Sequence, residues 1–123
     1  MKKGNDFRLG NLVECRDGFG RVTGIQDREV LEVGEIGYIM EDIKPIDITN
    51  RILLICGFVL ETFDSIDFYN LKLGSDKYGI SLTYVDCDNT FNVEDFQMTH
   101  IEHVHQLQNL YFALTGEELT FKL

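Results

Sequence analysis

The stretch THIEHVHQLQNLYFALTGEELTFKL, residues 99–123, decides most about the fold, because a helix start, an apolar stripe and a helix stop follow one another in it. Thr99 and Glu102 have the spacing of a capping box, in which two side chains satisfy backbone N–H groups of the first helical turn. Gly116 stands where such a helix is expected to end. Between these signals apolar residues recur at helical spacing, at Ile101, Val104, Leu107, Tyr111 and Leu114.

The borders of this region allow a second interpretation. In it, residues 98–104 form a strand and the helix begins only near His103.

Tyr111 and Phe112 are expected to pack in the core rather than to form an exposed docking stripe. Residues 119–123 are expected to return as a strand. The opposite, polar face of the helix holds His105, Gln108 and Asn109.

Upstream of this region the chain consists mostly of short apolar runs separated by turn residues, which is typical of strands. A single helical turn is expected at residues 41–44, because Pro45 drives the residue before it away from helical angles. Strands this short and bent, with a one-turn helix, suit a small SH3-like β-barrel lobe at residues 1–48. The expected strands are 11–15, 20–26 with a bulge or bend at Gly24, 30–33, 36–40 and 46–48.

Residues 49–123 are expected to form a second, α+β lobe. Thr49 can cap a short helix at Asn50–Cys56, and Gly57 can follow its C-terminus. An antiparallel meander then precedes the C-terminal helix, with strands expected at 58–63, 67–73, 78–85 and 90–96. The predicted fold class is therefore α+β and mostly β. The sequence leaves open whether the two lobes form one compact unit.

The composition is that of an ordinary soluble globule, with 44% hydrophobic and 26% charged residues among 123. Cys15, Cys56 and Cys87 are widely spaced and form no CxxC pair, which indicates reduced, mostly buried thiols. The opening MKKGNDFRLG has no apolar run behind its lysines, so no signal peptide is expected. The longest apolar stretch, residues 52–56, is far below the roughly 20 residues of a membrane span. We therefore expect a cytoplasmic protein.

The charge is −10, and residues 51–123 contribute eleven acids against four bases, a net −7. A negative surface repels phosphate backbones and phospholipid headgroups. Direct nucleic-acid binding and membrane binding are therefore not expected.

The candidate metal-binding residues are His100, His103 and Glu102. On a helix, His100 and His103 lie three apart and share one face, so both could reach one ion. His105 is displaced around the axis, and no HExxH pattern exists. We therefore predict no metal and no cofactor.

Catalytic patterns are also missing from the sequence. The cysteines have no neighbouring histidine, although a pairing in space stays open. Ser65 and Ser81 lie outside a GxSxG elbow, and the paired acids are adjacent rather than facing. We predict no catalytic residue and a protein that is not an enzyme.

The C-terminal string VHQLQNLYFALTGEEL, with RLGNLV at residues 8–13 and the region 41–57, resembles a family of small uncharacterised proteins. They are encoded in gut bacteria and in their phages and mobile elements. Over residues 58–97 the similarity is one of pattern only. The family carries no established activity, so no site residue follows from it. The resemblance implies a bacterial or phage cytoplasmic setting and a β-rich body with a helix near the C-terminus.

Two functional hypotheses from different classes follow. SH3-like barrels commonly present a groove for peptides, and their edge strands can accept another chain. The first hypothesis is therefore a non-enzymatic protein-binding or adaptor module of bacterial or phage origin, with a protein partner. The alternative is an acidic nucleic-acid mimic that inhibits a host DNA-binding protein, because the second half of the chain is so acidic.

Overall fold

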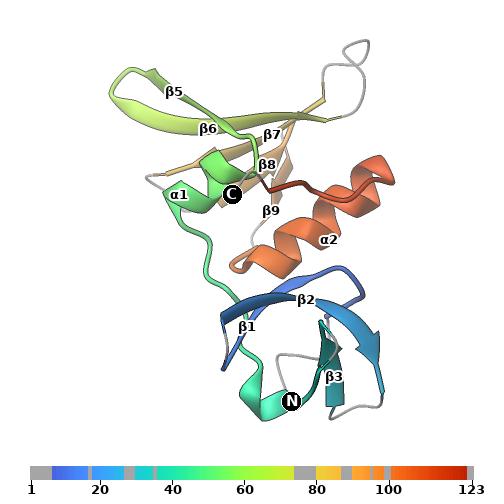
Figure 1. Ribbon diagram of the computed structural model, residues 1–123. Coiled ribbons are helices and arrows are strands. Elements are labelled where there is room, and N and C mark those ends of the chain that lie inside the picture. The colour runs from blue at the N-terminus through green and yellow to red at the C-terminus, as the bar shows by residue number, and fades with distance from the viewer. Residues whose placement is uncertain are drawn as a thin grey trace. The chain divides into compact units, whose positions relative to one another are not determined.

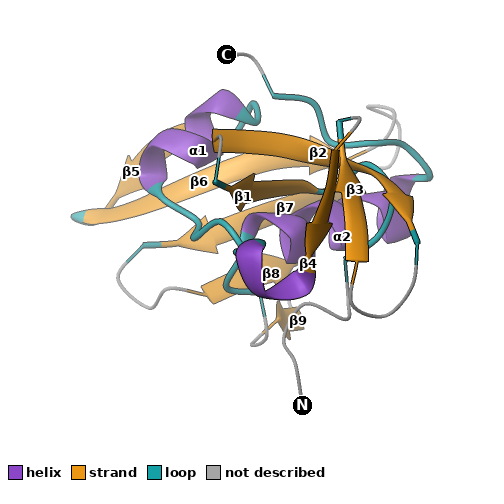
Figure 2. Ribbon diagram, turned by 60° about the horizontal axis from the view of Figure 1, so that its bottom comes forward, coloured by secondary structure: helices purple, strands orange, loops and turns teal. Residues whose placement is uncertain are grey.

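The computed structural model describes residues 7–16, 18–26, 30–34, 36–73, 80–86, 90–94, 96–98 and 101–121. They divide into two compact units (Figure 1). The first unit comprises Met1–Asp47 and Glu102–Leu110, and the second comprises Ile48–Ile101 and Tyr111–Leu123. Both units consist mostly of antiparallel strands, as Figure 2 shows, which confirms a mostly β chain with a C-terminal helix. The predicted lobes, 1–48 and 49–123, stay a prediction, and the contacts group residues 102–110 with the first unit.

The first unit is built on a four-stranded antiparallel sheet in the order β1-β2-β3-β4. The strands are β1 (Leu12–Cys15), β2 (Gly18–Ile25), β3 (Val30–Val33) and β4 (Ile36–Ile39). The pairing of β2 with β3 shifts register between Val22 and Gly24, which confirms the predicted irregularity. The buried core of the sheet consists of Phe7, Val13, Val22, Leu31, Val33 and Ile43.

The sheet of the first unit does not close into a barrel over its described strands. A short 3-10 helix, η2 (Met40–Asp42), follows β4 near the predicted one-turn helix. The predicted strand 46–48 is not formed, and only isolated bridges at Lys44 and Asp47 occur in this segment. Glu14 of β1 exchanges two backbone hydrogen bonds with Lys44, of 2.9 and 2.8 Å. The predicted SH3-like barrel is therefore not confirmed.

Helix α2 (Val104–Thr115) starts later than the capping box predicts. The backbone N–H of His103 donates to Oε1 of Gln106 at 2.9 Å, and the His103 carbonyl accepts from the N–H of Gln106 at 3.1 Å. His103 is thus the N-cap. Thr99 lies outside the described residues, but residues 101–103 are not helical, so the predicted start at the capping box is wrong and the alternative start near His103 is confirmed. The strand 98–104 of that alternative is not formed over the described residues 101–104. The helix ends as predicted at Gly116, where φ is 76°.

The predicted polar face of α2 is buried in its first turns. Gln108 and Asn11 are both 0% exposed. Oε1 of Gln108 accepts from the N–H of Leu12 at 2.7 Å, and its Nε2 donates to the carbonyl of Gly10 at 3.1 Å. The Gln108 amide therefore pairs with the backbone at the start of β1 as a neighbouring strand would. Asn11 adds a hydrogen bond of 2.8 Å from its Nδ2 to Oδ1 of Asn109.

The aromatic and apolar residues at the end of α2 are less buried than predicted. Phe112 and Leu114 are 41% and 42% exposed. Tyr111 is half-buried. The prediction of core packing is thus wrong for Phe112.

The second unit contains helix α1 (Asn50–Ile55) and a five-stranded antiparallel meander. Oγ1 of Thr49 accepts from the N–H of Ile52 at 3.2 Å, and φ is 100° at Gly57, so both predicted ends of this helix are confirmed. The strands are β5 (Val59–Phe63), β6 (Ile66–Leu73), β7 (Ile80–Val85), β8 (Thr90–Val93) and β9 (Phe96–Met98), paired in that order.

Two differences from the predicted strands concern the C-terminal half of the second unit. The predicted strand 90–96 is split into β8 and β9 at Glu94, which has a φ of 55°. The described part of the predicted strand 119–123, residues 119–121, is not in a strand.

The meander has one buried and one polar face, each with a cross-strand row of one residue per strand. Leu60, Tyr69, Tyr84, Phe91 and Met98 form the row on the core face. The rings of Tyr84 and Phe91 are 4.8 Å apart between centroids. Burial, with the charge of Asp86 and the Tyr69 phenol, raises the pKa of Tyr84, so its phenol stays neutral in the core. The row on the opposite face consists of Val59, Asn70, Thr83, Asn92 and Gln97.

Replacing Gln108 by leucine should lower the free energy of unfolding by about 2–4 kcal/mol, because the N–H of Leu12 and the carbonyl of Gly10 lose their buried partner. Urea denaturation followed by circular dichroism measures the loss. The matched control is Gln97→Leu, since Gln97 is exposed on β9, and it should change the stability by less than about 0.5 kcal/mol. Equal effects of the two substitutions would contradict the role given to Gln108.

Candidate functional site

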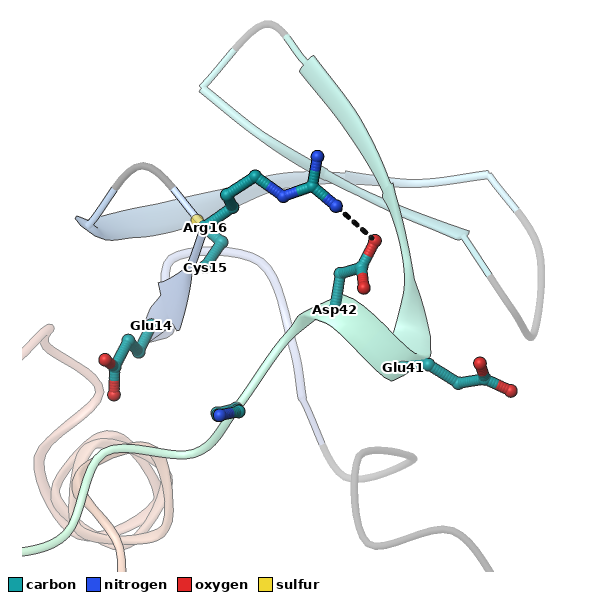
Figure 3. Close-up of a pocket in the computed structure, with 6 residues that line it drawn as sticks. Glu14, Cys15, Arg16, Glu41 and Asp42 are labelled. Carbon is teal, nitrogen blue, oxygen red and sulfur yellow. Dashed lines mark ion pairs between the residues drawn. The ribbon is translucent and has the colours of Figure 1, made fainter.

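The first unit has an open depression of about 300 Å³ between the end of β1 and η2 (Figure 3). One side of it is fixed by the backbone bridge between Glu14 and Lys44. The lining consists of three acidic side chains, two basic side chains and one thiol, from Glu14, Cys15, Arg16, Glu41, Asp42 and Lys44.

The charged groups of the depression are weakly coupled. Figure 3 shows Arg16 and Asp42 pointing toward one another, whereas Glu14 and Glu41 point away from this pair. Nη2 of Arg16 lies 3.8 Å from Oδ2 of Asp42, and the two side chains are 78% and 40% exposed. An ion pair this exposed contributes about 1 kcal/mol or less. The depression is thus a hydrated polar surface.

The two described cysteines lie in different environments. Sγ of Cys15, in the depression, donates to the carbonyl of Gly18 at 3.3 Å. No histidine is among the residues that line the depression, so they form no Cys–His nucleophile pair. Cys56 is 4% exposed, and burial raises the pKa of its thiol to about 12. A thiol with this pKa is protonated at neutral pH and is a poor nucleophile. Cys87 lies outside the described residues.

The two metal candidates that the structure describes, His103 and Glu102, belong to no group that could hold a metal ion. Nε2 of His103 lies 3.4 Å from Oδ1 of Asp47, and the His103 ring stacks on that of His105 with centroids 5.9 Å apart. Glu102 is exposed, and His100 lies outside the described residues. Over the described part of the chain, no group of three or more histidine, cysteine or acidic residues could hold a metal ion.

A second candidate surface is the outer border of the meander, which sequence reasoning did not single out. Strand β5 pairs with β6 alone among the described strands, and Figure 1 shows it along the rim of its sheet. All five residues of β5 are exposed, and Val59 and Phe63 reach 61% and 76%. We call Val59–Phe63 the β5 edge. Its pairing with β6 has no break in register, so it offers a regular, accessible strand.

The geometry of the hairpin indicates which backbone groups of the β5 edge point outward. Asp64 and Ser65 form a two-residue turn with φ of 54° and 66°, closed by the pair Phe63 and Ile66. A turn of this kind places Phe63 in a hydrogen-bonded pair, and such pairs alternate with non-hydrogen-bonded ones. It follows that the N–H and C=O of Leu60 and Thr62 point away from β6.

Side-chain hydrogen bonds stiffen the hairpin on both faces. On one face Oγ1 of Thr62 donates to Oδ1 of Asp67 at 2.8 Å. On the other face Nδ2 of Asn70 donates to Oε1 of Glu61, and Oγ1 of Thr83 donates to Oδ1 of Asn70 at 2.6 Å. The β5 edge is therefore held in an extended conformation before any partner arrives.

The residue pattern of the β5 edge explains why its exposure was missed. VLETF carries apolar side chains on both faces, a pattern that is typical of a strand buried on both sides. Only the strand order shows that it lies at an edge.

Comparisons with known proteins add no relative: no protein-family model, no curated protein and no solved structure matches this chain. The described helices include none with the length and apolar character needed to cross a membrane.

In a Cys15→Ser, Cys87→Ser variant, the remaining Cys56 should react with an aromatic disulfide reagent at pH 8 about a thousandfold more slowly than an unperturbed thiol. The reason is the rise in its pKa from 9.0 to about 12. Because the unfolded chain loses this proton first, the contribution of Cys56 to stability is complete below pH 9 and is lost as the pH rises toward 12.

The matched comparison is a Cys56→Ser, Cys87→Ser variant, in which Cys15 reports a partly exposed thiol. Similar rates for the two variants would show that Cys56 is accessible and would contradict its assignment as an inert core residue.

Proposed function

We propose that this chain is a non-enzymatic protein-binding module of bacterial or phage origin, which acts in the cytoplasm and receives a partner at the β5 edge. The observation that carries the proposal is the exposure of every residue of an unbroken edge strand. An added strand gains main-chain hydrogen bonds from the outward groups of Leu60 and Thr62, and its side chains contact those of β5.

Apart from the carboxylate of Glu61, the β5 edge carries little protection against strand addition. Proteins that avoid edge pairing use charged side chains, above all lysine, or a proline or a bulge on the edge strand. VLETF contains neither lysine nor proline, and its pairing with β6 is regular. An exposed edge with a single charge as its protection is a liability unless a partner occupies it, which favours a docking function.

The first unit supports the same class of function less directly. The SH3-like character of residues 1–48 remains part of the proposal, and the bridge from Glu14 to Lys44 supports it. In a barrel of that type a segment after the 3-10 helix would pair with the first strand. The polar depression offers charged groups but no convergent nucleophile and base among its lining residues, which favours binding over catalysis.

The alternative function, an acidic mimic of nucleic acid, is favoured by the charge of −7 in residues 51–123 and by the resemblance to proteins of phages and mobile elements. A mimic needs carboxylates arranged like phosphates, and its binding should fail at high salt. A nucleic-acid mimic does not require an exposed strand edge such as β5, whose outward backbone groups are free to pair with another strand. The β5 edge therefore ranks protein binding first.

Peptides that bind the chain can be selected from a random heptapeptide library. Their affinity should fall at least about tenfold in Thr62→Pro, because proline removes an outward N–H without breaking the β5–β6 ladder. The matched control is Thr62→Val, which also lacks the hydroxyl bonded to Asp67 but keeps the N–H, and it should bind within threefold of the unchanged chain. Fluorescence anisotropy measures the affinities.

Leu60→Pro tests the other outward position if Thr62→Pro unfolds. Peptides that bind both proline variants as tightly as the unchanged chain would refute strand addition at β5. The mimic would be supported instead if bacterial DNA-binding proteins bind both variants and dissociate at high salt.

A further inference from the structure

We infer that the partner of the β5 edge is an extended basic segment with the pattern apolar-x-basic-x-apolar, its basic side chain opposite Glu61. This inference rests on the proposed function and specifies the chemistry of the partner. It is carried by the charge of the hairpin and by the position of Glu61 within the strand.

The paired part of the hairpin, residues 59–70, carries acidic side chains and no basic one, and Lys72 lies beyond it near the end of β6. Residues 59–71 contain Glu61, Asp64 and Asp67 and no lysine, arginine or histidine. All of them lie in the described part of the chain, and Glu61 and Asp64 are exposed. A strand that lies along β5 is therefore attracted if it is basic and repelled if it is acidic.

The alternation of β5 fixes where the charge meets the partner. Val59, Glu61 and Phe63 project from one face of the strand, with the carboxylate in the middle. Because Leu60 and Thr62 supply the outward hydrogen bonds, Glu61 would face the partner in a non-hydrogen-bonded pair, in which side chains lie closest. The residue opposite Glu61 gains most from a positive charge.

The residues two positions before and after that basic residue would contact Val59 and Phe63. These side chains are 61% and 76% exposed, so an apolar partner side chain removes a large apolar area from water at each. Asn70 donates to Oε1 of Glu61 and holds the carboxylate in this row. The pattern apolar-x-basic-x-apolar follows from these three positions.

A second copy of the chain fits the β5 edge poorly. Antiparallel pairing of two β5 strands over their full length would place Glu61 opposite Glu61 of the second copy. Like charges directly opposite one another destabilise a strand pair. Each copy also carries a charge of −10. The charge thus selects a partner other than the chain itself.

Titration calorimetry with two blocked heptapeptides, SVTKTVS and SVTETVS, tests the inference. The unchanged chain should bind the lysine peptide at least about fivefold more tightly than the glutamate peptide. In Glu61→Lys the order should reverse. The matched control is Glu94→Lys, which makes the same change of net charge at an exposed residue of the same unit but outside β5, and it should keep the preference for lysine.

The outcomes separate this inference from the proposed function. If the two peptides bind equally well and Thr62→Pro abolishes the binding of both, the inference of a basic partner is overturned and docking at β5 remains supported. Failure of both these peptides and the library peptides to respond to Thr62→Pro would overturn docking itself. A dimer in sedimentation that dissociates in Thr62→Pro would show a second copy as the occupant and would also overturn the inference.

Discussion

The pairing of the Gln108 amide with the backbone of Gly10 and Leu12 is the interaction on which the first unit depends. Both Gln108 and Asn11 are fully buried, so each polar atom must be matched or the unit loses several kcal/mol. The partners come from opposite ends of the chain, with the second unit between them in sequence. The first unit is therefore complete only after residues 102–110 have returned to it.

This dependence has a kinetic consequence. Contacts between residues so distant in sequence require closure of a long loop before they contribute any stability. The network is polar and directional, so a helix that docks with a different face leaves buried amides unmatched. The arrangement therefore favours one placement of the start of α2 and destabilises placements in which the helix is rotated or shifted.

Much of the local structure could be predicted, because its signals lie in neighbouring residues. Thr49 and Gly57 delimit α1, and Gly24 marks the irregularity of β2, as expected. The prediction failed where a residue's role depends on distant partners. Gln108 looks like a solvent-facing side chain until β1 lies beside it. Gln106 caps α2 at His103, although the better sequence pattern lay upstream at Thr99 and Glu102.

The same limit applied to the functional surface. The net charge and the lack of catalytic motifs in the sequence could be read from composition and spacing, whereas the hypothesis of protein binding came from the expected SH3-like barrel. The β5 edge could not be predicted from the sequence. A strand lies at an edge when no second strand pairs with it, which only the strand order shows, and VLETF has the composition of a buried strand. The candidate metal residues show the converse: adjacency in sequence suggested a cluster, but His103 faces Asp47 instead.

A single carboxylate reconciles the two opposing demands on β5. An exposed strand with apolar side chains invites self-association, and a charge on the edge is the usual defence. Glu61 supplies that defence against identical copies, because full pairing would bring two carboxylates together. Against a basic strand the same carboxylate attracts, and the stiff hairpin has little conformational entropy left to lose on binding. The backbone of the β5 edge could pair with almost any extended strand, so the charge of the incoming strand decides which one binds.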